Sequence, residues 1–181
     1  MFKDKSKIKG KVTVTVFGPD GEVKRRPQNW FQKLFGFIGS PMISINHNIV
    51  TDQGDALIAD LMSTTPTRQK VDNTNGRITV GTGWTGTTPK QNTACNTPTG
   101  SAEAMDATYP KQKGAFGAAN DNVTQYRATF EAGDLNATGI DEAALHNTTV
   151  DNLAYAQVTP TVDVTTSDTL QVDWELTLLG A

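Results

Sequence analysis

The chain has 181 residues, which is enough for one domain with a substantial core, or for one domain with an arm. Its 16 basic and 19 acidic side chains and a pI of about 5.3 argue against an obligate nucleic-acid binder, which would carry a dominant basic face. The single cysteine, Cys95, excludes an internal disulfide and a Cys-x-x-Cys metal knuckle; no secretory signal is predicted, and no stretch approaches the roughly 20 apolar residues of a membrane span.

The N-terminal third predicts a hairpin followed by a short helix. Residues 11–17 alternate and are rich in β-branched side chains, as in a strand, and residues 18–21 (Gly-Pro-Asp-Gly) have the composition of a turn. Residues 22–26 should then return as the second strand of the hairpin. Helical spacing follows in the apolar residues Trp30, Phe31, Leu34, Phe35 and Ile38. Residues 1–45 are therefore interpreted as an N-terminal arm.

Charge is unevenly distributed along the chain. Between Lys3 and Lys33 there are nine basic and three acidic side chains, and the rest of the chain is acidic. Such an asymmetry indicates a basic arm that meets an acidic surface. Solvated lysines that keep one end of the chain soluble would produce the same pattern, and both interpretations stay open.

Residues 46–181 predict a β-sheet core with one internal helix. The helix is expected over 51–62, with Thr51 as its N-cap. Residues 84–121 show neither helical nor strand periodicity and are predicted to be a long loop that is functional or held by a neighbour. Strands are expected at 77–81, 123–131, 140–145, 153–158 and 170–178. This pattern predicts an all-β fold, an antiparallel sandwich or a jelly-roll-like arrangement.

No arrangement of residues typical of catalysis is present in the sequence. His47 and His146 fit no metal-ligand spacing. Asp141 and Glu142 should point to opposite faces of a strand, which argues against a carboxylate pair. The glycines of residues 81–86 follow a strand, but no helix pattern comes after them to bind a phosphate. We expect the protein not to be an enzyme, and we predict no catalytic, metal-binding or cofactor-binding residue.

A cluster of apolar residues without an evident core is the strongest candidate site. It runs from Trp30 to Ile38, within the basic arm and before most of the strands. A contiguous exposed apolar patch marks an interface, and aromatic residues next to Arg are typical hot spots. A helix that plugs one end of the sandwich would show the same pattern, and both interpretations stay open. The candidate interface residues are Arg25, Arg26, Trp30, Phe31, Leu34, Phe35 and Trp84.

Several short motifs, in their order and spacing, resemble the N-terminal domains of phage tail-collar or tail-fibre proteins. The first is Gly54-x-x-x-Ile58-Ala59, and the second is the run 78–83 followed by Thr88-Pro89. The third is the run 126–130 followed by 140–147, which is similar to that family's "EaGLF"-type signature. The resemblance spans about residues 47–178. Two departures from the family are expected: an added N-terminal hairpin over residues 11–26, and no repetitive shaft of the kind into which family members often continue, because the given sequence stops at Ala181.

The resemblance implies a non-enzymatic structural component of a tailed-bacteriophage virion, assembled in the host cytoplasm. It would form symmetric protein–protein contacts as a tail, collar or fibre-attachment protein; a head decoration (cement) protein on the capsid surface is the alternative. The expected partners are other virion proteins and further copies of the chain, with no nucleic acid and no membrane. A carbohydrate-binding module with Trp84 as its sugar platform is a more distant alternative.

Overall fold

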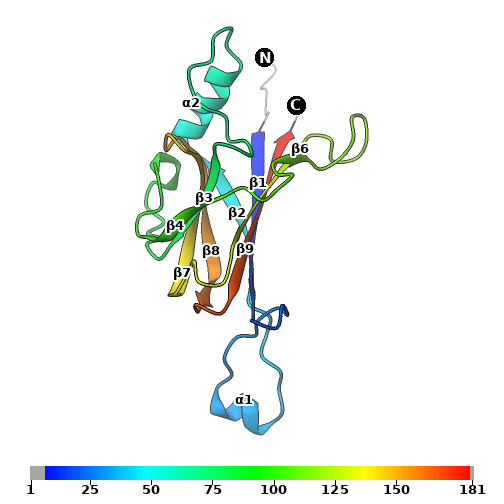
Figure 1. Ribbon diagram of the computed structural model, residues 1–181, viewed down its shortest axis with the longest axis vertical. Coiled ribbons are helices and arrows are strands. Elements are labelled where there is room, and N and C mark those ends of the chain that lie inside the picture. The colour runs from blue at the N-terminus through cyan, green and yellow to red at the C-terminus, as the bar shows by residue number, and fades with distance from the viewer. Residues whose placement is uncertain (1–6, 180–181) are drawn as a thin grey trace, which may run out of the picture.

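The computed structural model describes residues 7–179, and these form one nine-stranded antiparallel sheet (Figure 1). The strands are β1 (Lys7–Phe17), β2 (Ile43–Val50), β3 (Gly76–Gly81), β4 (Pro98–Ala104), β5 (Lys111–Gln112), β6 (Val123–Phe130), β7 (Ala137–Asn147), β8 (Asn152–Val164) and β9 (Thr169–Leu179). Their order in the sheet is β4-β3-β7-β8-β2-β1-β9-β6-β5. The helical segments are α1 (Trp30–Leu34), α2 (Asp52–Leu61) and the 3-10 turn η1 (Pro89–Gln91). The predicted all-β class is confirmed.

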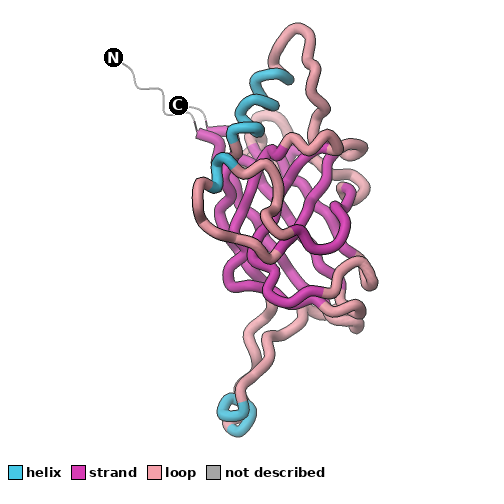
Figure 2. Tube along the Cα trace, turned by 90° about the vertical axis from the view of Figure 1, so that its left-hand side faces the viewer, coloured by secondary structure: helices cyan, strands magenta, loops and turns pink. Residues whose placement is uncertain are grey.

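The sheet curls around an apolar core (Figure 2). β4 and β6 are far apart in the strand order but lie close together in space. The N–H of Asp106, two residues after β4, donates to the carbonyl of Arg127 in β6 at 2.9 Å. The Thr129 hydroxyl also donates to the Asp106 carboxylate at 2.8 Å. Alternate side chains, such as Val14 of β1 and Trp174 of β9, are completely buried inside the curl. In the predicted sandwich the core would lie between two sheets, whereas here one curled sheet encloses it.

β1 belongs to the interior of the sheet. It lies between β2 and β9 and pairs with β9 along its whole length. The boundary predicted after residue 45 therefore does not separate an arm from a core. Only residues 18–42 project from the body, while the strand before them is central to it (Figure 1).

The predicted return strand at 22–26 is not a full strand. Among the described residues, strand pairing in this segment is limited to two isolated β-bridges, Phe17 with Val23 and Arg25 with Pro41. The reason is that β2 pairs with β1 in the position that the return strand would have taken. No strand is predicted from the sequence for residues 43–50, so β2 is a finding of the structure.

Residues 84–121 are more ordered than the predicted long loop. They contain η1, β4, which pairs with β3, and β5, which pairs with β6. β4 is mostly exposed along its length. A strand without a buried face has no apolar alternation, and this is why periodicity does not reveal it.

α2 begins as predicted and covers the end of the sheet that lies away from α1 (Figure 1). The Thr51 hydroxyl caps the helix by accepting the Gly54 N–H at 3.0 Å. A Cβ at Gly54 would lie 2.1 Å from the Leu153 carbonyl oxygen, so glycine permits the helix to approach β8 this closely. Leu57 is buried, and Ile58 and Leu61 pack against the core.

Candidate interaction site on the projecting arm

Residues 18–42, here called the arm, leave the body between β1 and β2 and carry α1 at their far end (Figures 1 and 2). The arm starts with the predicted turn, in which Gly21 has a φ of +76°, a conformation that favours glycine. The two sides of the arm are then joined by backbone hydrogen bonds. The Met42 N–H donates to the Lys24 carbonyl at 2.7 Å, and the Arg26 N–H donates to the Ser40 carbonyl at 2.9 Å.

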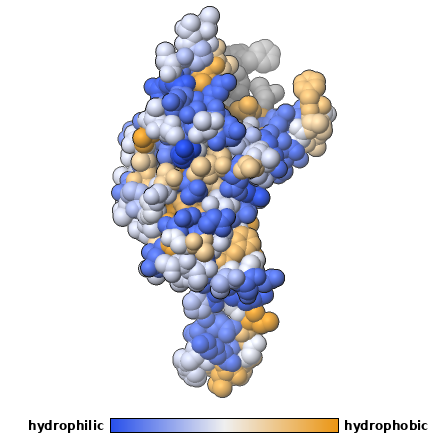
Figure 3. Space-filling model, in the orientation of Figure 1, coloured by the Kyte–Doolittle hydropathy of each residue, from blue (hydrophilic) through white to orange (hydrophobic). Residues whose placement is uncertain are grey.

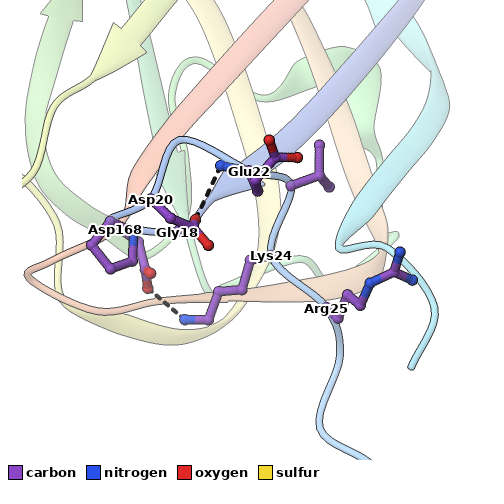
Figure 4. A pocket seen from close by; sticks show the side chains of 8 residues that line it. Gly18, Asp20, Glu22, Lys24, Arg25 and Asp168 are labelled. Atoms are coloured by element: carbon purple, nitrogen blue, oxygen red, sulfur yellow. Dashed lines mark hydrogen bonds and ion pairs between the residues drawn. The ribbon is translucent and has the colours of Figure 1, made fainter. Parts of the chain in front are cut away.

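The base of the arm is also fixed to the body by side chains (Figure 4). Lys24 Nζ lies 2.5 Å from Asp168 Oδ2, and Asp168 is only 3% exposed. Burial alone would raise the pKa of Asp168, but hydrogen bonds from Lys24 and Thr165 outweigh it and hold this pKa below its usual value. Arg26 Nη1 donates to the Thr161 carbonyl at 2.5 Å. These contacts set the direction of the arm relative to β8 and β9.

Asp168→Asn is expected to destabilise the protein by about 1.5–3 kcal/mol at pH 7, because it weakens charge-assisted hydrogen bonds at a buried position. The folded-state pKa of Asp168 is lowered, so its contribution is present above the unfolded-state pKa of about 4 and is lost as the pH falls below that value. Urea unfolding at pH 7 and pH 3 measures this. The difference between wild type and variant should shrink at pH 3; an equal difference at both pH values would contradict it.

The far end of the arm is ordered by its own hydrogen bonds. Asn29 Oδ1 accepts the Gln32 N–H at 2.8 Å, and Gln32 Oε1 accepts the Asn29 N–H at 3.2 Å, which is a complete capping box. The Gln28 side chain donates to the Phe37 carbonyl across the arm. α1 is therefore held in shape although none of its five residues is buried.

The arm tip, defined as residues 29–38, exposes six large apolar side chains (Figure 3). The rings of Trp30 and Phe31 meet edge to face at 5.6 Å, and Phe31 lies 4.7 Å from Phe35. The tip projects away from the sheet, so the alternative that this helix plugs one end of a sandwich is wrong. The six side chains are between 52% and 76% exposed: Trp30, Phe31, Leu34, Phe35, Phe37 and Ile38.

The structure brings together six of the seven predicted interface residues. Four of them lie at the tip: Trp30, Phe31, Leu34 and Phe35. The other two, Arg25 and Arg26, lie in the arm between the tip and the body.

Trp84 lies in a different part of the molecule. Its ring stacks on Tyr155, with 5.0 Å between ring centroids and 26° between planes. Its backbone N–H donates to Asp141 at 3.0 Å. One face of the indole is therefore covered by Tyr155, and Trp84 does not join the arm residues.

Glu142 holds the loop that carries Trp84. Its carboxylate is completely buried and accepts the backbone N–H groups of Gly83, Asn96 and Thr97 at 2.8–3.1 Å. It also accepts the Tyr155 hydroxyl. A carboxylate with this many donors is already satisfied, which makes it an anchor for the 82–97 loop.

Asp141 and Glu142 both bind this loop, although simple strand alternation predicts opposite faces. Asp141 accepts the N–H of Trp84, and Glu142 accepts the N–H of the residue before it. The pairing of β7 with β8 shifts register between Ile140 and Glu142. This irregularity changes the direction of the two side chains, and no sequence signal marks it.

Two other reactive groups, Cys95 and His146, are buried and partnered, whereas His47 is exposed on β2. Burial and the charges of Glu142 and Asp141 raise the pKa of the Cys95 thiol, which disfavours a thiolate. His146 lies 2.7 Å from the Thr79 hydroxyl and 2.8 Å from the Asn147 carbonyl, and burial lowers its pKa. Residues 7–179 contain no cluster of three or more His, Cys, Asp or Glu suited to a metal ion. In the same range no helix has the length and apolar character needed to cross a bilayer.

One exposed aromatic residue is missed by sequence reasoning. Phe116 is 97% exposed in the loop between β5 and β6, and the rest of residues 114–119 is glycine and alanine, so no second large side chain marks a patch there. No family model, curated protein or solved structure matches this chain.

Proposed function

We propose that the protein is a non-enzymatic structural subunit that assembles with neighbouring subunits through its arm, as a component of a tailed-bacteriophage virion. The observation that supports this is the arm tip, where six large apolar side chains are exposed to solvent at the end of an arm whose base is fixed to the body. Soluble monomers rarely expose contiguous apolar surface of this kind, whereas interfaces use it. Aromatic anchors next to arginine are also typical of binding hot spots.

The ordered arm suits docking onto another protein. Because the capping box and the base contacts already hold its shape, little conformational entropy remains to be lost on binding. The role in the particle would be that of a tail, collar or fibre-attachment protein, with a head decoration protein as the alternative. Both roles use the arm in the same way, and the number of copies per particle distinguishes them.

The mass of the full chain in solution tests the proposal. Sedimentation velocity over a concentration series should show self-association for the wild type and a monomer for the tip variant Trp30→Ser/Leu34→Ser/Phe35→Ser. Ile45→Ser is the matched control, since Ile45 is exposed to a similar degree but lies on β2. This control should associate like the wild type.

Two outcomes would overturn the proposal. One is that the wild type and the tip variant are both monomers at every concentration. The other is that the wild type stays monomeric but sediments with anionic phospholipid vesicles while the tip variant does not. That second result would assign the arm to a membrane surface, because aromatic and basic side chains also suit a lipid interface.

A further inference from the structure

The molecule carries most of its exposed large apolar side chains at two opposite ends. The arm tip lies at one end (Figure 1). Other such side chains lie in segments at the opposite end: the end of α2, the loop between β5 and β6, the turn between β7 and β8, and the last residues of β9. These are Met62, Phe116, Val150 and Leu178. Because the base of the arm is fixed, the tip cannot reach this far end of its own chain.

The outer side of α2 combines carboxylates with apolar side chains. Asp52, Asp55, Ala59 and Met62 recur every three or four residues, so they form one stripe along the helix. Met62 is 82% exposed, and the two carboxylates are 59% and 58% exposed. Both carboxylates share Lys90, at 3.1 and 2.5 Å. The stripe, here called the α2 stripe, therefore keeps a net negative charge.

The arm and the α2 stripe are complementary in charge. The arm contains four basic and two acidic side chains, while the α2 stripe has two carboxylates that share one lysine. The tip itself carries one charged residue, Lys33, in the last turn of α1. Opposite charges around an apolar contact fix the register of an interface and exclude other partners.

We propose that the arm tip of one copy docks on the α2 stripe of a second copy. This contact rests on the proposed function and identifies the surface to which the arm tip binds. The aromatic rings cover Ala59 and Met62, and Lys33 approaches Asp52 and Asp55. Each copy uses two different surfaces, so the contact is heterologous and joins copies head to tail, in a row or in a closed ring.

A charge swap in the full chain tests this contact. Lys33→Glu and Asp52→Lys should each weaken self-association about tenfold or more, as expected when close charge pairs are broken at an interface. The double variant, which restores opposite charges, should recover most of the wild-type association constant in sedimentation equilibrium. Glu131→Lys is the control, because Glu131 is exposed near the arm end of the body. Circular dichroism verifies that each variant is folded.

A second variant separates this inference from the proposed function. Ala59→Glu leaves the arm intact and places a charge in the middle of the α2 stripe, so it should abolish association as the tip variant does. If the tip variant is monomeric while Ala59→Glu and Asp52→Lys associate like the wild type, the α2 stripe is not the docking surface. Assembly through the arm would then stand, and this inference would fall.

Discussion

Glu142→Ala is expected to lower the free energy of unfolding by about 3–5 kcal/mol, the usual cost of breaking a buried charged network. The substitution leaves three backbone N–H groups and the Tyr155 hydroxyl without their acceptor inside the protein. Each buried donor that loses its partner costs about 1–3 kcal/mol. Urea denaturation followed by circular dichroism measures the change.

The same substitution should loosen the 82–97 loop before the whole protein unfolds. Cys95 is buried under this loop, so its thiol should react faster with a disulfide reagent in Glu142→Ala than in the wild type. Glu131→Ala is the control, because that carboxylate is exposed, and surface changes of this kind alter stability by no more than about 0.5 kcal/mol. A loss below about 1 kcal/mol for Glu142→Ala, with unchanged thiol reactivity, would show that the carboxylate does not anchor the loop.

Trp174→Ala and Trp30→Ala are expected to change different properties: the first lowers stability, and the second weakens self-association. Trp174 is completely buried between β1 and β6, so its truncation should cost about 3–5 kcal/mol of stability. Its indole N–H has no hydrogen-bond partner in residues 7–179, so Trp174→Phe removes volume without breaking a hydrogen bond and should cost less. Trp30 is 74% exposed, and its truncation should change stability by less than about 0.5 kcal/mol.

Self-association provides the second measurement on this pair. Trp30→Ala should weaken assembly, but in dilute samples where both proteins are monomeric its unfolding midpoint should equal the wild-type value, because the side chain contributes to an interface and not to the core. Sedimentation over a concentration series and thermal unfolding of the monomeric samples give both numbers, since association alone raises the midpoint. A monomeric Trp30→Ala protein that unfolds several degrees lower would mean that the arm packs on its own body.

The strands that are best predicted from sequence are those with one buried face. In β9 the alternation from Leu170 to Leu176 matches the observed burial, because each inward position meets the core. β2 is not predicted because its inward positions are polar. Ser44 and Asn46 face the interior and donate to the carbonyls of Pro160 and Thr159, while Ile45 faces solvent.

These polar contacts depend on the path of β8. β2 and β8 pair through backbone hydrogen bonds only near Asn48–Val50, and farther along side chains replace the backbone ladder. A polar residue is tolerated inside a sheet where a neighbouring carbonyl accepts its hydrogen bond. That carbonyl comes from a segment more than a hundred residues away in the chain, which no local pattern can indicate.

The sequence by itself determined the all-β class, the N-cap of α2 and the composition of the arm tip, because these depend on local spacing and residue type. The tertiary structure alone decided that the tip is exposed. Helical spacing at Trp30, Phe31 and Leu34 is the same for a buried and a projecting helix. The difference arises because β1 lies in the middle of the sheet and Lys24 is held by Asp168, and together they point the tip away from the core.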